Sequence, residues 1–189
     1  MTLEEIYYIG QTVAVLAILA SLGAIWFQMR QSQKMERASA QRELLDRVAE
    51  YQRSFTLAEA DHWLLGMDDL EAASYETKMV VHNKLSEFVF ITESALNMHR
   101  EGFFSEGTWA GIEGVMLGVL RTPGGQQFWA YARHYIGFEI ADHLNKRLAE
   151  VGTDGPNFID AVPFYRPRLE ELKRSFAPAS EPAEEEPAA

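Results

Sequence analysis

The stretch "IYYIGQTVAVLAILASLGAIWF" covers Ile6–Phe27, and none of its 22 residues is charged. As a helix rising about 1.5 Å per residue it is about 33 Å long, close to the roughly 30 Å hydrocarbon core of a bilayer. Tyr7 and Tyr8 stand near one end and Trp26 near the other, and such aromatic residues are enriched at both membrane interfaces. The stretch predicts a single transmembrane helix over residues 6–27, with the lipid bilayer as its partner.

Two other interpretations of this stretch are a cleavable signal peptide and a buried helix of a soluble protein. A signal peptide begins with basic residues, whereas here Glu4 and Glu5 precede the apolar run. A core helix of a soluble protein normally has a polar face, whereas only Gln11, Thr12 and Ser21 are notably polar here. The composition therefore favours the membrane span over both alternatives.

Basic residues follow the span but do not precede it. No Lys or Arg occurs before Ile6, and five occur soon after Phe27. They are Arg30, Lys34, Arg37, Arg42 and Arg47. Because basic flanks tend to stay in the cytoplasm, we expect residues 1–5 outside and the C-terminal domain in the cytoplasm. The inverted arrangement, with a periplasmic domain, is the alternative.

Small residues recur within the span at spacings of 4, 3, 4 and 3. They are Gly10, Ala14, Ala17, Ser21 and Ala24. This spacing places them on one helical face, and small faces let transmembrane helices approach closely. The face predicts self-association or packing against another membrane protein, although Gly and Ala are also simply common in such helices.

The residues after the span predict an all-α protein. Residues 28–43 lack Pro and Gly and are rich in helix formers, so we expect the span to continue as a stalk helix. Residues 44–151 predict a bundle of four to six helices, in which Ser74 and Ser105 begin two helices. The apolar run "FVFI" at Phe88–Ile91 marks the helix after Ser74 as the central one.

The C-terminal part is less regular. "RTPGG" at Arg121–Gly125 predicts a break between helices. Residues 152–176 contain three prolines and predict an arm that ends in a short helix. Residues 177–189 carry four acidic and no basic side chains, and their composition predicts a disordered acidic tail.

Composition excludes several functions. The net charge is −11, and an acidic protein without clustered Lys and Arg is a poor nucleic-acid binder. The chain has no cysteine, which rules out disulfides, thiol catalysis and cysteine zinc sites. No nucleophile motif or phosphate-binding loop is visible, so no catalytic residue is assigned.

The histidine, acidic and aromatic residues of the bundle raise the question of a metal or ligand site. A di-metal carboxylate bundle needs two Glu-x-x-His pairs, and Glu59 with His62 supplies only one. We therefore expect no metal and no cofactor. Four aromatic residues of the bundle are candidates for an apolar ligand pocket, although such residues more often form the core. They are Trp109, Phe128, Trp129 and Tyr135.

Three segments carry a resemblance to a known group of proteins. They are "SLGAIWFQMRQSQKMERASAQRELL" from Ser21, "MHREGFFSEGTW" from Met98 and "RTPGGQQFWAYAR" from Arg121. Together they resemble a widespread group of small uncharacterised bacterial membrane proteins with an N-terminal span and a cytosolic helical domain. The resemblance covers roughly residues 10–148 and leaves out the chain from Pro163 onward. It implies a location in the bacterial inner (plasma) membrane, but no activity and no catalytic residues.

Two functions are compatible with these observations. The first is a membrane-anchored interaction or scaffolding protein without catalysis, which the span, its small-residue face and the stalk favour. The second is a sensor or carrier that binds a small apolar ligand or lipid at the cytoplasmic membrane surface. A well-formed cavity of about 300 Å³ or more among the aromatic residues would favour the second function.

Overall fold

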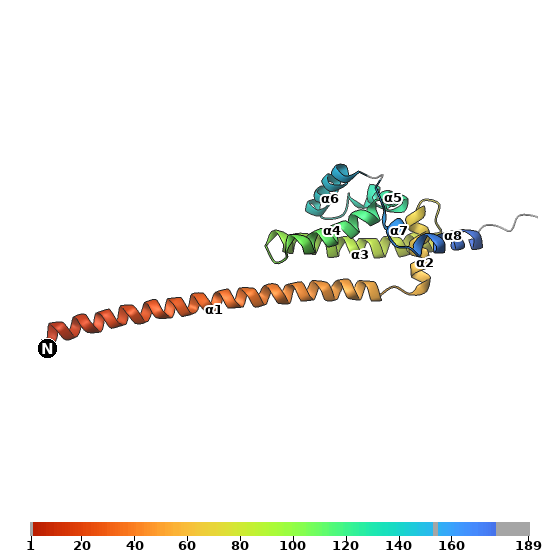
Figure 1. Cartoon of the computed structure of the whole chain (residues 1–189). Coiled ribbons are helices and arrows are strands. Elements are labelled where there is room, and N and C mark those ends of the chain that lie inside the picture. The colour runs from red at the N-terminus through yellow and green to blue at the C-terminus, as the bar shows by residue number, and fades with distance from the viewer. Residues whose placement is uncertain (1, 153–154, 177–189) are drawn as a thin grey trace, which may run out of the picture. The chain divides into compact units, whose positions relative to one another are not determined.

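The structure is a computed structural model that describes residues 2–152 and 155–176. These residues form eight helices and no strand (Figure 1), which confirms the all-α fold class. The helices are α1 (Leu3–Arg53), α2 (Leu57–Asp68), α3 (Tyr75–Arg100), α4 (Glu106–Leu120), α5 (Pro123–Ala132), α6 (Phe138–Val151), α7 (Phe158–Ala161) and α8 (Tyr165–Phe176). The predicted acidic tail, residues 177–189, lies outside the described residues.

The chain divides into two compact units, Met1–Asp46 and Arg47–Ala189. The first unit consists of the N-terminal part of α1, a helix of 51 residues that runs through the predicted span and stalk. The second unit contains the end of α1 and the helices α2–α8. The sequence placed the start of the domain at residue 44, close to this division.

Side chains that precede the helices fix where several of them begin. Ser74 and Ser105 accept hydrogen bonds from the backbone N–H groups of Thr77 and Thr108, both at 3.2 Å. These bonds satisfy donors that the first helical turn leaves free, and they confirm both predicted starts. The start of α2 carries a capping box, in which Thr56 and Glu59 bond to each other's backbone N–H groups.

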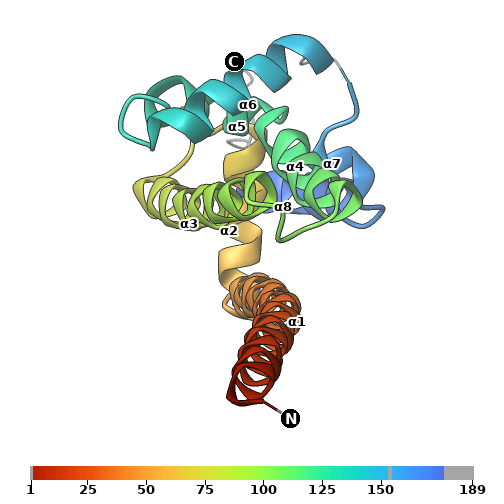
Figure 2. The same ribbon diagram turned by 90° about the vertical axis from the view of Figure 1, so that its left-hand side faces the viewer.

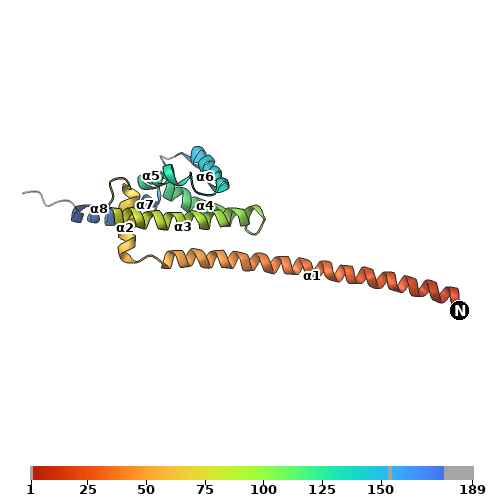
Figure 3. The same ribbon diagram turned by 180° about the vertical axis from the view of Figure 1, so that it is seen from behind.

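Helix α3 is the central element of the second unit. It contacts α2, α4 and α6, and α4, α5 and α6 gather on one side of it (Figure 2). Helix α2 crosses α3, as Figure 3 shows from behind. The central position agrees with the sequence, and Phe88, Val89 and Ile91 of "FVFI" are buried. Phe90 of the same run is 51% exposed and lines an open hollow together with Ser94.

The core of the second unit is built from large apolar side chains. Its fully buried members include Met67, Leu85, Met116, Phe128, Ile140 and Leu144. The end of α1 joins this core through Tyr51, whose ring stacks on Phe88 with centroids 5.4 Å apart. Burial raises the pKa of Tyr51, so the ring remains a neutral core residue.

The "RTPGG" break is shorter than the sequence predicted. Thr122 caps α5 and Pro123 is its first residue, a position where proline is favoured because no N–H is needed. Gly124 therefore lies inside the helix, in the first turn, and packs against the backbone of α2. A Cβ atom on Gly124 would lie 1.8 Å from the carbonyl oxygen of Gly66. Only glycine allows this approach of the two helices.

The predicted C-terminal arm contains two helices, α7 and α8. Helix α7 contacts α4, and α8 contacts α2. Leu169 and Leu172 of α8 are buried. The guanidinium group of Arg168 bonds both carboxylate oxygens of Asp61 at 3.0 and 2.8 Å, and these bonds lower the pKa of Asp61. Apolar contacts and a bidentate ion pair thus hold the end of the described chain on the bundle.

The close approach of α5 to α2 makes a testable prediction. Gly124→Ala should lower the free energy of unfolding by about 3 kcal/mol, because the methyl group meets backbone atoms that cannot move aside. Thermal unfolding of the full-length protein in detergent micelles, followed by tryptophan fluorescence, measures the change.

Gly111→Ala is the matched control for this prediction. Gly111 is an exposed interior residue of α4, and nothing lies within 4 Å of the position of its Cβ. Alanine there should raise stability by about 0.5–1 kcal/mol, because it restricts the unfolded chain and favours the helix. Equal effects of the two substitutions would contradict the close approach.

Candidate functional site

The N-terminal part of α1 is a candidate membrane anchor. It is the one helix among residues 2–152 and 155–176 with the length and apolar composition to cross a bilayer, and its apolar stretch has no buried side chain. Val13, Leu16 and Leu19, for example, are 60%, 60% and 58% exposed. A soluble protein rarely exposes an apolar surface of this extent, so the stretch needs a covering of lipid or protein.

The hydroxyl groups within this stretch are satisfied by the helix itself. Thr12 donates a hydrogen bond to the carbonyl oxygen of Tyr8 at 2.9 Å, and Ser21 donates to that of Ala17 at 2.8 Å. A polar group without a partner is costly in hydrocarbon. These two internal bonds make both side chains compatible with a lipid environment.

The five small residues predicted to form an association face lie on this helix. Because α1 is unbroken from Leu3 to Arg53, their spacing places Gly10, Ala14, Ala17, Ser21 and Ala24 along one side of it. All five are exposed, and nothing lies within 4 Å of a Cβ on Gly10. The side is open along its length and offers room for a neighbouring helix backbone.

The four aromatic residues predicted to line a pocket separate into different surroundings. Trp109, Phe128 and Trp129 are buried, whereas Tyr135 is 53% exposed. Phe128 and Tyr135 approach the His82 ring, with centroids 6.2 and 6.1 Å away. The indole N–H of Trp129 donates to Asn145 at 2.8 Å. The three buried rings are thus part of the core, and the ligand pocket remains a prediction.

Trp109 lies between two histidines from other helices. The His99 ring stacks on it at 5.8 Å, and the His143 ring meets it edge-on at 5.4 Å. The Nε2 atom of His99 is 3.2 Å from a carboxylate oxygen of Glu106, while its buried Nδ1 has no hydrogen-bond partner in the described part of the chain. This stack joins α3, α4 and α6.

A buried carboxylate completes this junction. Glu113 is 6% exposed. Its two oxygens accept hydrogen bonds from Arg147 at 3.0 and 3.1 Å, and one of them is 2.6 Å from Nε2 of His143. Burial raises the pKa of Glu113, but the hydrogen bonds and charges of Arg147 and His143 outweigh burial and leave the pKa below its usual value. Glu113 is therefore a carboxylate that ties α4 to α6.

This cluster was not predicted from the sequence. Glu113 interrupts an otherwise apolar face of α4, with Trp109 and Met116 on either side, and a charged residue in such a place is a signal for a buried ion pair. Its partners lie 30 and 34 residues further along the chain. Only the packing of α6 on α4 identifies them.

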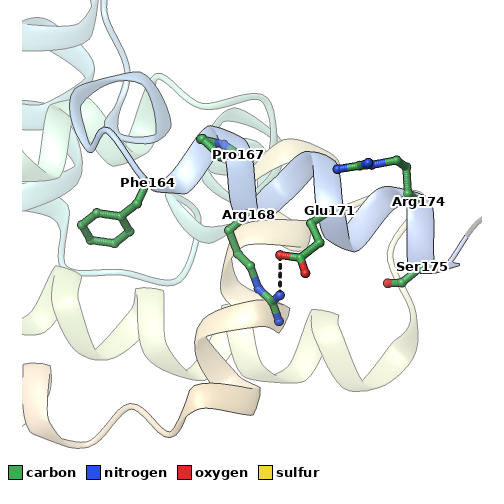
Figure 4. Close-up of a pocket in the computed structure, with 6 residues that line it drawn as sticks. All are labelled: Phe164, Pro167, Arg168, Glu171, Arg174 and Ser175. Carbon is green, nitrogen blue, oxygen red and sulfur yellow. Dashed lines mark hydrogen bonds and ion pairs between the residues drawn. The ribbon is translucent and has the colours of Figure 1, made fainter.

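Two surface hollows of the second unit are lined by none of the predicted pocket residues. One of about 770 Å³ is an open depression along α8 (Figure 4). It is lined by Phe164, Pro167, Arg168, Glu171, Arg174 and Ser175, and the Arg168–Glu171 ion pair of 2.7 Å lies in it. A second hollow of about 360 Å³ lies at the start of α3 and is lined mainly by apolar atoms, with Tyr75, Met79 and Val80 among its residues.

The histidine and acidic side chains do not gather into a metal site. Within the part of the chain that the structure describes, no three His, Asp or Glu side chains lie close enough to share an ion. His62, of the single Glu-x-x-His pair, has its Nδ1 2.8 Å from the Thr77 hydroxyl. Glu59 caps its own helix. Both residues of the pair thus have structural partners.

Comparisons with protein-family models, with curated proteins and with solved structures find no match for this chain.

The Glu113 cluster predicts a specific acid sensitivity. Glu113→Gln should lower the free energy of unfolding by about 2 kcal/mol at neutral pH, because the bonds from two charged donors are weakened. A carboxyl group whose folded pKa is depressed stabilises the fold above its unfolded pKa of about 4.3, and this contribution is lost as the pH falls through the folded pKa. The difference between wild type and variant should therefore shrink below about pH 4.

Glu150→Gln is the matched control. Glu150 also pairs with Arg147, but its side chain is 46% exposed, so its removal should cost less than about 1 kcal/mol. Urea unfolding of the full-length protein in detergent at several pH values measures both. A constant difference between Glu113→Gln and wild type at all pH values would contradict the role of the ionised carboxylate.

Proposed function

We propose that the protein is a membrane-anchored interaction or scaffolding protein that performs no catalysis. In this proposal residues 6–27 cross the bacterial plasma membrane once, and the helical domain lies in the cytoplasm. The protein would meet a second copy of itself, or another membrane protein, through the small-residue face of α1. The anchor would keep the helical domain close to the membrane, where its surface could bind a partner.

The observation that carries this proposal is the uncharged, exposed helical stretch Ile6–Phe27. A bilayer would cover the apolar side chains on all sides of this helix at once. A small patch on another protein would cover only one side of it. The aromatic residues Tyr7, Tyr8 and Trp26 would then lie at the two interfaces. The second unit has its own buried core, so it does not need the stretch in order to fold.

The small-residue face supports an interaction role. Lipid tails are as apolar as the helix, so helices associate in membranes through close packing and not through the hydrophobic effect. On this face the Ser21 hydroxyl is bonded to its own helix, and Gly10 has open space around it. Both features leave the backbone accessible to a partner helix.

The basic residues after the span support the cytoplasmic placement. Five Lys or Arg residues lie between residues 30 and 47, and none precedes the span. Orientation of single-span proteins follows this asymmetry. The resemblance to bacterial span-and-domain proteins supports the plasma membrane as the location.

A ligand sensor or carrier is the alternative function. The hollow at the start of α3 favours it, because its volume of about 360 Å³ and its mainly apolar lining suit a small apolar ligand. Binding of a fluorescent fatty acid that Met79→Asp abolishes would support this alternative over a purely scaffolding role.

Crosslinking tests the proposed association face. The chain has no cysteine, so a single Leu3→Cys substitution provides a defined crosslinking site. Leu3 lies seven residues before Gly10, two turns along the same face of the helix. In membranes, disulfide-linked dimers should form, and Ala17→Leu or Ser21→Leu should reduce them several-fold because the larger side chains push the helices apart.

Gly23→Leu is the control for this experiment. It adds at least as much volume, but Gly23 lies on the far side of the helix from the five small residues, so crosslinking should persist. Carbonate extraction of the same membranes should leave every variant in the pellet. Release of the wild type by carbonate would overturn the anchor, and equal crosslinking of all variants would overturn the association face.

A further inference from the structure

A second face of α1 combines one aromatic and three basic side chains. At about 100° per residue, Trp26, Arg30, Lys34 and Arg37 fall within a sector of about 100° on the helix. The guanidinium carbon of Arg30 lies 4.4 Å from the centre of the Trp26 ring, a cation–π contact. Arg30, Lys34 and Arg37, together with Gln33, line a hollow of about 260 Å³.

These three cations have no anionic partner in the first unit. Among residues 2–152 and 155–176, no carboxylate forms an ion pair with Arg30, Lys34 or Arg37. The nearest acidic residue in sequence is Glu36, and it accepts a hydrogen bond from Ser32 at 3.1 Å. The face therefore presents a net positive charge to whatever surrounds it.

The distance of each cation from the span decides which ones meet the membrane surface. For a helix near the bilayer normal, Arg30, Lys34 and Arg37 lie about 6, 12 and 17 Å beyond Trp26. The headgroup layer is about 5–8 Å thick on each side, and charge is felt for about another 8–10 Å at physiological salt. All three cations fall within this range. Arg42, about 24 Å beyond Trp26, falls outside it.

We propose that Trp26, Arg30, Lys34 and Arg37 form a binding site for the phosphate of anionic phospholipid headgroups. This inference rests on the proposed membrane insertion. Trp26 would fix the depth of the site at the interface. Arg30 would donate to the phosphate oxygens within the headgroup layer, and Lys34 and Arg37, which lie beyond this layer, would add longer-range attraction.

The position of this basic face fits the proposed association face. At the same angle per residue, the small residues from Gly10 to Ala24 lie on roughly the opposite side of α1. A partner helix packed on the small residues would leave the basic face turned toward lipid. Charge complementarity selects the occupant, because a bilayer surface that carries anionic lipid is negative.

Lipid retention tests the site on the full chain. The protein is reconstituted in vesicles of phosphatidylcholine and phosphatidylglycerol, extracted in mild detergent, and its bound lipids are counted by native mass spectrometry. We expect phosphatidylglycerol to be enriched over phosphatidylcholine. Each of Arg30→Gln, Lys34→Gln and Arg37→Gln should lower the enrichment by up to about fivefold.

Arg42→Gln is the matched control, because it removes the same charge from the same helix beyond the reach of the headgroups. It should leave the enrichment unchanged. An equal loss in Arg42→Gln and Arg30→Gln, or no enrichment in the wild type, would overturn the site. Displacement of the bound phosphatidylglycerol by inorganic phosphate would also overturn it, because the site would then bind a free anion.

Carbonate extraction of the same vesicles separates this inference from the proposed function. If the wild type is released by carbonate, the membrane anchor itself fails, and the headgroup site fails with it. If the wild type stays in the membrane without phosphatidylglycerol enrichment, only the headgroup site fails.

Discussion

The apolar surface of the first 27 residues is the constraint on which the rest of the structure depends. Thirteen large apolar side chains between Ile6 and Phe27 are more than half exposed. Leaving them in water would cost on the order of 10–20 kcal/mol, comparable with the whole stability of a small domain. The helix must therefore be covered, and a bilayer has the matching thickness.

The proposed covering gives the remaining features of α1 a common explanation. The hydroxyls of Thr12 and Ser21 bond within the helix, which removes the cost of placing them in hydrocarbon. The small residues lie on one side and the basic residues on the other, so protein and lipid headgroups would not compete for the same surface. The second unit, by contrast, is stabilised by its own core and by ion pairs such as Arg147–Glu113 and Arg168–Asp61.

The features that could be predicted from the sequence are those set by residues close together in the chain. Length and composition identified the apolar helix, and the caps Ser74 and Ser105 identified two helix starts, because each signal lies within a few residues of its effect. Contacts between distant residues were not predictable. The Glu113 cluster, the His82 ring contacts and the approach of Gly124 to Gly66 each join segments that only the packing of helices brings together. The exposure of Phe90 was not predictable either, since periodicity does not tell which side of a helix lacks a neighbour.

Cysteine accessibility tests the central claim, the membrane span, most directly. Thr2→Cys, Leu19→Cys and Ser39→Cys are each made in the cysteine-free chain and exposed to a membrane-impermeant maleimide in intact and in permeabilised cells. The span predicts labelling of Thr2→Cys in intact cells, labelling of Ser39→Cys only after permeabilisation, and protection of Leu19→Cys in both. Labelling of Leu19→Cys as fast as Ser39→Cys in permeabilised cells would contradict the span.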